Sequence, residues 1–381
     1  MSVPSSRDRG VTVNRVLTVL LCGDVMTGRG IDQILPHPAD PRLQERWVDD
    51  ARTYVELAEK ANGPIPRPVE FSWPWGDALP MLDGLAPDAR LINLETSITA
   101  DGTFAPGKAV HYRMSPDNVG CLTVARPDVC VLANNHVLDF GQQGLADTLD
   151  ALAGAGIAWA GAGRDAEEAE RVVTVDVGRG RRLLVFSGGM ESAGVPRQWA
   201  ATATRPGVAF LPDLSNRVAG AIADRIRRHK RPGDVAVVSL HWGSNWGYDV
   251  GHGQVRFARR LIDGGVDVVY GHSSHHPRPI EVYRGKLILY GCGDVINDYE
   301  GIRGYEAYRD DLHLLYLASI DADRGELAFL RMLPMQTRAM RLRRTSPADT
   351  EWLRSTLERA GRDFGTRVHR EPGGTLVVRP A

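Results

Sequence analysis

The sequence predicts an α/β protein with layered sheets, and two patterns along the chain lead to this prediction. Short apolar runs rich in β-branched residues recur, and each ends abruptly in Gly, Asp, Asn or His. Such runs are typical of strands that are buried on both faces. Stretches with apolar residues at helical spacing lie between them. Alternation of strand and helix along one chain is the pattern of an α/β fold.

The polar residues that follow the apolar runs predict where a ligand would bind. The strands are expected at residues 16–22, 91–92, 129–133, 183–186, 235–240, 266–270 and 287–290. The helices are expected between them at residues 144–155, 216–229 and 254–264. In α/β folds the polar residues at strand ends converge on one crevice, which is where ligands bind. The functional site is therefore expected at the ends of these strands.

The chain is expected to form one domain with an elaborated edge. We expect residues 1–15 to form a disordered leader and residues 16–381 to form the domain, because no apolar segment of signal-peptide length follows the leader. An insertion at 36–77, rich in Pro and Trp, interrupts the alternation. It fits either a lid or substrate-binding element or a structural cap on the sheet. A C-terminal extension at 311–381 should add a strand pair, an amphipathic helix at 347–365 and a final strand.

Composition and hydropathy exclude several classes of function. The 381 residues carry a formal net charge of -1, with a pI near 6.8, so no overall field would attract nucleic acid or anionic lipid. The longest apolar stretch near the N-terminus, Val16–Cys22, is far shorter than the ~20 residues of a membrane helix. We therefore expect a soluble cytoplasmic protein that binds neither nucleic acid nor a membrane.

The cysteines and the missing motifs narrow the chemistry further. Four cysteines lie in or beside apolar runs without paired metal-ligand spacing: Cys22, Cys121, Cys130 and Cys292. We expect them to be small buried side chains in a reducing compartment. The sequence has no P-loop Gly-Lys-Ser/Thr, no Gly-x-Ser-x-Gly and no Cys-x-x-Cys. No nucleotide cofactor is therefore expected.

Oxygen donors follow three of the expected strands. Asp24 lies in Gly-Asp-Val-Met, Glu95 in Asn-Leu-Glu, and Asn135 in Asn-Asn-His. Carboxylate and amide oxygens are hard donors that suit Ca, Mg or Mn. Each residue taken singly is as well explained as a turn or cap residue. Together, at the ends of neighbouring strands, they predict a divalent metal site.

Histidines follow the next two strands. His241 ends one strand, and His272, His275 and His276 lie within five residues at the end of the next. Imidazole broadens the choice of metal to Zn or Fe, and an imidazole that is not a ligand can move protons near its pKa of about 6.5. The cluster supports both metal binding and acid–base chemistry. Donor hardness favours Ca, Mn or Mg over Zn.

Two carboxylates are placed to orient histidines. We hypothesise that His136 pairs with Asp139 or another nearby carboxylate, and that His275 pairs with Asp294. Such a carboxylate fixes the imidazole tautomer and raises its basicity. An equally good interpretation makes Asp139 the N-cap of the helix that begins near Gln142.

Aromatic and arginine side chains are candidates for substrate contacts. The tryptophans are Trp73, Trp75, Trp242 and Trp246, which could form an apolar pocket, although packing is the commoner role of tryptophan. Arg113 and Arg278 are candidates for gripping a carboxylate bidentately.

An ordered set of motifs runs through the chain: Gly23-Asp24, Asn93-Leu94-Glu95, Asn134-Asn135-His136 with Asp139 and Gly141, His241-Trp242-Gly243, Gly271-His272, and Gly291 to Asp298. From about residue 16 to 300 this set resembles the CapA family, which is named for poly-γ-glutamate capsule synthesis and is related to the calcineurin-like metallophosphoesterases. The resemblance implies a four-layer α/β/β/α sandwich, here with an inserted lid segment, whose loops hold one or two metal ions.

The resemblance also implies roles for single residues. The residues that resemble metal ligands are Asp24, Glu95, Asn135, His241 and His272. His136 resembles the histidine beside the metal, and His275 the second histidine of the Gly-His-x-His region. Two departures matter: Met26 stands where phosphoesterases carry a histidine, and Asp294 stands where the family has Asn. Both departures point away from routine phosphate hydrolysis.

Three functions remain open for such a chain. Capsule-type members carry a membrane anchor, and a soluble member resembles the lasso-peptide epimerases. The leading hypothesis is therefore a metal-dependent epimerase that inverts the Cα of the C-terminal residue of a ribosomal precursor peptide, with the two His/Asp pairs as acid and base. The alternatives are a metallohydrolase of phosphoester or γ-glutamyl amide bonds, and a non-catalytic module that binds capsule polymer or peptide.

Overall fold

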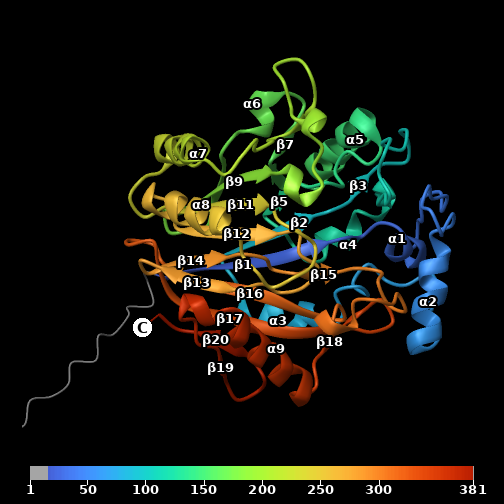
Figure 1. Cartoon of the computed structure of the whole chain (residues 1–381). Helices are drawn as coiled ribbons and strands as arrows, with labels where there is room; N and C mark the ends of the chain where they lie inside the picture. Colours follow the sequence, from blue (N-terminus) through green and yellow to red (C-terminus); the bar gives the residue numbers. More distant parts are fainter. Residues whose placement is uncertain (1–15, 381) are drawn as a thin grey trace, which may run out of the picture.

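The computed structural model describes residues 16–380, so the leader predicted at 1–15 lies outside the described residues. Its larger sheet has ten strands, with β1 near the middle (Figure 1). The order is β19 (His369–Arg370), β20 (Leu376–Val378), β17 (Glu326–Thr337), β16 (Leu312–Asp321), β1 (Val16–Val25), β2 (Ala89–Leu94), β5 (Val129–Val131) and β6 (Ala158–Ala160). Off this path, β15 (Asp294–Ile296) pairs with β1 and β18 (Leu342–Arg344) pairs with β17.

A second sheet, of six strands, packs against the first. Its order is β13 (Ile280–Tyr283), β14 (Lys286–Leu289), β12 (Val268–His272), β11 (Val235–His241), β9 (Arg182–Gly189) and β8 (Val173–Asp176). Two short ladders pair β3 (Ser97–Ile98) with β4 (Arg113–Met114), and β7 (Ala162–Gly163) with β10 (Gly207–Val208). Strands β15, β1, β2, β5 and β6 are parallel neighbours, as are β14, β12, β11 and β9. Their carboxyl ends therefore lie at one edge of each sheet.

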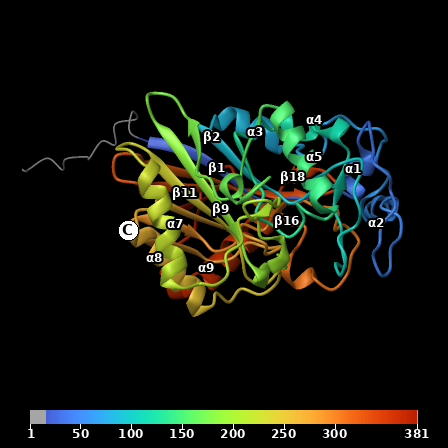
Figure 2. The ribbon, with the colours of Figure 1, turned by 90° about the horizontal axis from the view of Figure 1, so that it is seen from above.

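Most of the helices lie outside the pair of sheets, whereas the last one packs Leu353 and Leu357 into the core between them. They are α1 (Gly30–Ile34), α2 (Arg52–Asn62), α3 (Ala78–Leu85), α4 (Gly120–Thr123), α5 (Gly141–Gly154), α6 (Ala166–Ala169), α7 (Asn216–His229), α8 (His252–Asp263) and α9 (Pro347–Ala360). Helices α7 and α8 lie side by side, well away from α1 and α2, in both ribbon views (Figures 1 and 2).

Three hydrophobic cores separate the layers. The first fills the space between α7, α8 and the smaller sheet, with Ile222 and Phe257 against Val238. The second lies between the two sheets, and the third lies between the larger sheet and a group of helices that includes α2, α3 and α5. This is the predicted α/β/β/α order of four layers, and the fold prediction is confirmed.

Strand β1 shows how the sequence builds these layers. Leu17, Val19 and Leu21 point into the core between the sheets, whereas Leu20 and Cys22 point into the core beneath the helices. Successive side chains of a strand point to opposite faces, so a strand between two cores must be apolar at every position. All four cysteines are buried and free, as predicted.

The predicted elements are present, with shifts at their ends. The helix predicted at 216–229 coincides with α7. The strand predicted at 16–22 continues to Val25, because Asp24 and Val25 still pair with β2 and β15. The helix predicted at 347–365 ends at Ala360, and a 3₁₀ turn follows it.

The insertion at 36–77 is mostly a structural cap. Val55 and Ala58 of α2, followed by Ile65 and Trp75, are buried in the core beneath the larger sheet. The cap interpretation therefore accounts for the second half of the insertion. Glu45, in the first half, reaches inward and pairs with the buried Arg29 at 3.0 Å.

The C-terminal extension is an integral part of the larger sheet. Strand β16 pairs with β1 along seven residues of β1, from Val16 to Cys22, and β17 pairs with β16 in turn. The extension therefore buries one edge of the strand that carries Asp24. No helix within residues 16–380 has the length and apolar character needed to cross a membrane.

Candidate functional site

The polar residues at the strand ends come together, as predicted. Asp24 lies near the end of β1, Glu95 follows β2, and Asn135 follows β5. His241 and His272 end β11 and β12 and are register partners in the smaller sheet. Because the parallel strands of both sheets end at the same place, residues separated by more than 200 positions share one site.

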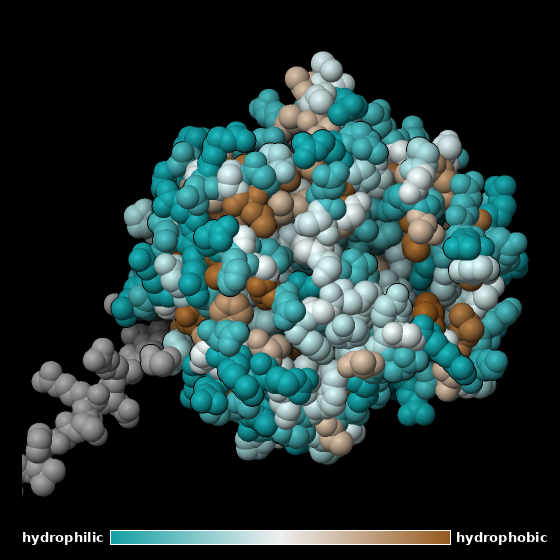
Figure 3. Space-filling view, in the orientation of Figure 1, coloured by the Kyte–Doolittle hydropathy of each residue, from teal (hydrophilic) through white to brown (hydrophobic). Residues whose placement is uncertain are grey.

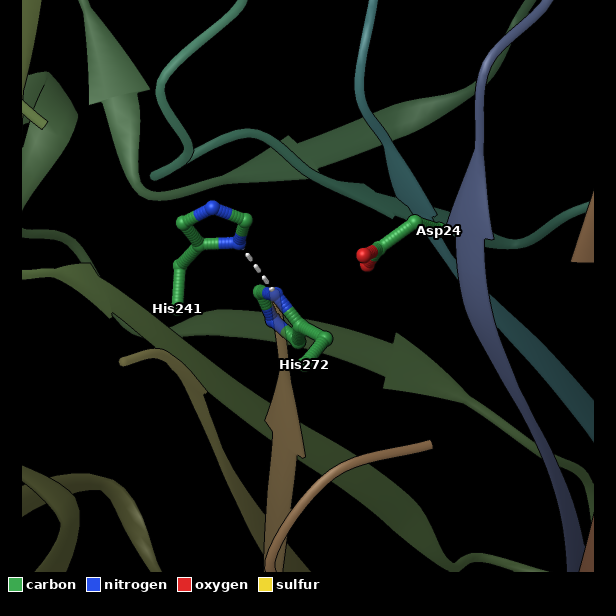
Figure 4. A group of neighbouring side chains, drawn as sticks. All are labelled: Asp24, His241 and His272. Carbon is green, nitrogen blue, oxygen red and sulfur yellow. Dashed lines mark hydrogen bonds between the residues drawn. The ribbon is translucent and has the colours of Figure 1, made fainter. Parts of the chain in front are cut away.

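One group of side chains has the geometry of a metal site. Asp24 of β1 points toward His241 and His272 (Figure 4), and one donor atom from each lies within 4.8 Å of the others. The Nδ1 atoms of the two imidazoles are 2.8 Å apart, and Nε2 of His272 is 2.6 Å from Oγ of Ser239. All three side chains are buried.

Glu95 and Asn135 border this group. Nε2 of His241 is 2.9 Å from Oδ1 of Asn135 and 4.0 Å from Oε1 of Glu95. The Asn93 amide donates to Oδ1 of Asp24 at 2.7 Å and to Oε2 of Glu95 at 3.0 Å. Thus all five predicted ligands lie around one point, with Asn93 tying two carboxylates together.

The charges at this point are those of a site built for a cation. Burial and the nearby Asp294 carboxylate raise the pKa of Asp24 to about 7, and burial with Asp24 and Asp294 raises the pKa of Glu95 well above its usual range. Within residues 16–380, no Lys or Arg forms an ion pair with any of these three carboxylates. A divalent cation would compensate this buried negative charge.

The histidines of the group are in the protonation state that a ligand needs. Burial, followed by the nearby His272, lowers the pKa of His241 well below its ordinary value, and burial lowers the pKa of His272 to about 3. Both imidazoles are therefore neutral at physiological pH, with a lone pair free for a metal. The residues present fit a divalent metal ion.

A second group shares Asp24. Donor atoms of Asp24, His275 and Asp294 also lie within 4.8 Å of one another. Strand β15 brings Asp294 beside Asp24, its register partner in β1. Nδ1 of His275 lies 2.9 Å from Oδ1 of Asp294, which is the predicted pairing, and the Asn297 amide donates to Oδ2 of Asp294 at 2.8 Å.

The other predicted pair is also formed. Nδ1 of His136 lies 2.6 Å from Oδ2 of Asp139, and the same oxygen accepts the backbone N–H of Tyr112 at 2.7 Å. Asp139 does not cap the following helix, because the N-cap of α5 is Phe140 and no side chain caps it. Nε2 of His136 lies 3.8 Å from Oε1 of Glu95, the carboxylate that borders the metal group.

Lys108 is a site residue that the sequence did not reveal. Its Nζ lies 2.5 Å from Oδ1 of Asp139 and 3.3 Å from Nδ1 of His136, and it also donates to the Asn135 carbonyl. Lys108 belongs to the long connection between β3 and β4, which has no local pattern that points to the site. Only the fold shows that this connection lies over the His136–Asp139 pair.

The two paired histidines differ in proton affinity. Burial lowers the pKa of His136 to about 4, and the Lys108 cation adds to this effect against the opposing pull of Asp139. Burial also works against charge on His275, but the Asp294 and Asp24 carboxylates outweigh it and raise the pKa of His275. Near neutral pH one imidazole is an acceptor of protons, while the other holds its proton more firmly.

Three of the four tryptophans pack within the fold. Trp75 and Trp242 are almost fully buried and donate to the carbonyls of Cys121 at 2.7 Å and Tyr290 at 3.1 Å. Trp73 donates to the Ala339 carbonyl at 3.1 Å. Packing, which the sequence already favoured over a pocket, accounts for these three positions.

Trp246 contacts a residue of the candidate site, whereas the contacts given for Arg278 and Arg113 are with residues outside it. The Trp246 ring packs on His275, with centroids 5.4 Å apart, and stacks on Tyr305 at 4.0 Å. Arg278 is buried and donates to the carbonyl and hydroxyl of Ser244, so it is used in holding a loop. Arg113 stacks on Phe140 and forms no ion pair within residues 16–380.

Comparisons with known proteins agree with the resemblance seen in the sequence. The family profile described as bacterial capsule synthesis protein PGA_cap matches residues 18–299. A probable polyglutamine synthesis accessory protein of Mycobacterium tuberculosis is 59% identical over 367 residues, which is 96% of this chain and 97% of the relative. The PGA biosynthesis protein CapA of Bacillus subtilis is 27% identical over 308 residues, covering 79% of this chain and 67% of that protein.

Among solved structures, a 5'-nucleotidase precursor from Thermus thermophilus aligns with 93% of this chain at 15% identity and a TM-score of 0.46. The chain spans 61% of that protein. The family profile covers well over half of the chain, and it includes all the strands that carry the candidate site. The chain therefore belongs to the bacterial capsule synthesis protein family, the family of CapA.

Proposed function

We propose that this protein is a metal-dependent hydrolase that cleaves amide bonds in a glutamyl or glutaminyl polymer. The observation that carries the proposal is the position of His136. Its Nε2 lies 3.8 Å from Oε1 of Glu95, which borders the group formed by Asp24, His241 and His272, and its Nδ1 is held by Asp139. The names of the relatives, which refer to polyglutamine synthesis and PGA biosynthesis, support the choice of substrate.

The residues divide into those that hold a cation and those that move protons. Asp24, His241 and His272, with Glu95 and Asn135 beside them, would hold the ion. A divalent cation bound there supplies Lewis-acid polarisation of the scissile carbonyl and lowers the pKa of an attacking water. Among Ca, Mg and Mn, the two imidazoles favour Mn, because imidazole suits transition metals better than the hard alkaline-earth ions.

His136 moves the proton. Asp139 accepts the Nδ1–H of the neutral imidazole and so leaves Nε2 free to take a proton from water. As water adds to the carbonyl and the C–N bond breaks, the proton on Nε2 passes to the leaving amine. The products are a carboxylate and an amine. Lys108 balances the charge of Asp139 and keeps that carboxylate in place.

A second candidate is the peptide epimerase, and one observation favours it. Two histidines, each bonded to a buried carboxylate, have pKa values shifted in opposite directions. Inversion of a Cα needs an acceptor of the proton on one face and a donor on the other. His136 would be the acceptor and His275 the donor, on a precursor peptide bound in the cytoplasm.

One experiment separates these candidates. The protein is incubated in D₂O with γ-linked glutamate and glutamine oligomers and with candidate precursor peptides, with Mn²⁺, Ca²⁺, Zn²⁺ or chelator. Amine release that requires metal and is lost in His136→Ala supports the hydrolase. Deuterium uptake at Cα without cleavage supports the epimerase instead. Silence with every substrate and metal would overturn both and leave a module that binds polymer or peptide.

A further inference from the structure

A polar cavity lies outside the candidate site, at the C-terminal end of α9. It has a volume of about 340 Å³, and four arginines line it: Arg354, Arg359, Arg362 and Arg367. Glu358 is the one carboxylate among the lining residues. In Figure 3 the surface over this C-terminal segment, at the bottom of the view, is mostly hydrophilic. The cavity is thus a cationic hollow on a protein whose net charge is -1.

Three of the four arginines form no close ion pair in the part of the chain that the structure describes, although Arg367 also interacts electrostatically with Glu358. Arg354 is paired with Glu351 at 2.7 Å and with Glu358 at 2.5 Å, so its charge is compensated. Arg359, Arg362 and Arg367 form no ion pair with any residue of the described chain, 16–380. Three exposed guanidinium groups therefore converge on one hollow whose single carboxylate is already used.

The cavity is linked to the candidate site through Tyr290. The Phe364 ring, between the lining residues Arg362 and Gly365, stacks on Tyr290 with centroids 5.1 Å apart. The Tyr290 carbonyl accepts the indole N–H of Trp242 at 3.1 Å, and Trp242 directly follows His241 in the chain. Two contacts therefore join the turn that lines the cavity to the strand end that carries His241, so an extended ligand can reach from one to the other.

We propose that this cavity, which we call the arginine site, binds carboxylates of an anionic polymer while a neighbouring part of the same polymer enters the candidate active site. Guanidinium groups match carboxylates in both charge and planar geometry. Three of them suit a chain with a carboxylate on every unit better than a single small acid. The arginine site favours a glutamate polymer over a glutamine polymer. The proposal rests on the proposed function for the choice of polymer and for the entry of the polymer into the candidate active site.

Binding is measured without turnover. A fluorescein-labelled γ-linked glutamate oligomer is titrated with full-length protein in chelator, and anisotropy is recorded. The triple variant Arg359→Gln/Arg362→Gln/Arg367→Gln should weaken binding by roughly tenfold, since each exposed pair contributes modestly. The matched control is Arg217→Gln/Arg228→Gln/Arg231→Gln, which removes three exposed arginines in and just after α7 and should bind like the parent. Added salt should weaken binding by the parent protein and reduce the difference between the two triple variants.

Two further probes identify the ligand chemistry. The γ-linked glutamine oligomer, which lacks the carboxylates, should bind weakly to every variant. Inorganic phosphate should compete at high concentration only; competition at low concentration would make phosphate the ligand and overturn the polymer proposal. Equal binding of the glutamate oligomer by the two triple variants would also overturn it, and thermal unfolding checks that both are folded.

These outcomes are separable from the proposed function. If the metal-loaded protein cleaves no oligomer but binding still depends on the three arginines, the arginine site stands and the hydrolase fails. If cleavage occurs and the triple variant binds and cleaves like the parent, the arginine site fails alone. With both correct, the triple variant should have a raised KM for long oligomers and an unchanged rate with a γ-glutamyl anilide, which is too short to reach the cavity.

Discussion

The His136–Asp139 pair and the His275–Asp294 pair are chemically alike, but the charged groups around them differ. Each imidazole is buried and bonded through Nδ1 to a buried carboxylate. Next to the first pair, Lys108 neutralises Asp139, so burial prevails and the pKa of His136 falls. Next to the second pair, Asp24 adds negative charge, and the pKa of His275 rises. The partner of a histidine therefore does not define its role; the net charge around the pair does.

The largest expected effect is the loss of metal affinity when the Asp24 carboxylate, which is shared by the two metal-binding groups, is removed. Asp24→Asn should lower metal affinity by more than the roughly 100-fold typical of a residue behind a ligand, and activity should fall with it. Isothermal titration with Mn²⁺ on the metal-free protein measures the affinity. Asp298→Asn, which breaks the bond to Arg29 outside the metal group, is the control. Unchanged Mn²⁺ affinity in Asp24→Asn would show that the ion binds away from Asp24, His241 and His272.

The comparison itself is tested by His136→Ala against His275→Ala. For a hydrolase, His136→Ala should lower kcat by about 10²–10⁴-fold, the usual range for a general acid–base group, and His275→Ala should have a much smaller effect. Rates are measured with saturating metal, so that weaker metal binding in a variant does not lower its measured kcat. Equal large losses in the two variants would indicate that both pairs act in catalysis, as an epimerase requires.

Lys108→Met should make the first pair resemble the second. Loss of the cation leaves the charge of Asp139 uncompensated, so the pKa of His136 should rise from its value of about 4. The acidic limb of the pH–rate profile then moves to higher pH, so kcat falls more at acid pH than at neutral pH. NMR titration of the metal-free protein follows the imidazole directly. The control is Lys230→Met, which removes a lysine that is paired with the buried Asp267 outside the candidate site. This variant should change neither the pKa of His136 nor the pH–rate profile.

The smallest effect is on the stability of the metal-free protein as a function of pH. The folded-state pKa of Asp24, about 7, lies above its ordinary 3.8, and the pKa of His275 is also raised. Each group therefore stabilises the fold at low pH and loses that contribution as pH rises through its folded-state pKa. The ionisation of Asp24 and the deprotonation of His275 should together lower the thermal midpoint of the metal-free protein by a few degrees as the pH is raised to about 8.

Two variants and the metal check this assignment of the pH dependence. Asp24→Asn should flatten the decline, because it removes the carboxylate that ionises in the folded state, and His275→Ala should flatten it less. Saturating Mn²⁺ should also flatten it, because the ion favours the charged form. A decline that persists unchanged in Asp24→Asn would assign the titration to other groups.

Much of the fold and of the site was predictable from local patterns. Val16–Cys22 is recognisable as a strand because nearly every position is apolar, and β1 is in fact packed between two cores. The His136–Asp139 pair was predictable because the two residues share one short turn. For Trp75 and Trp242 the sequence left a pocket possible beside the commoner packing role, because tryptophan has the same sequence signal in a pocket and in a core.

The sequence by itself determined the order of strands and helices and placed polar donors after several of the buried strands, since apolar periodicity and its abrupt end are local properties. Only the tertiary structure decided which donors meet. The pairing of β15 with β1 brings Asp294 to Asp24, and a long connection brings Lys108 to Asp139. Charge and burial at a point sum over residues far apart in the chain, and so the opposite proton affinities of His136 and His275 exist only in the folded protein.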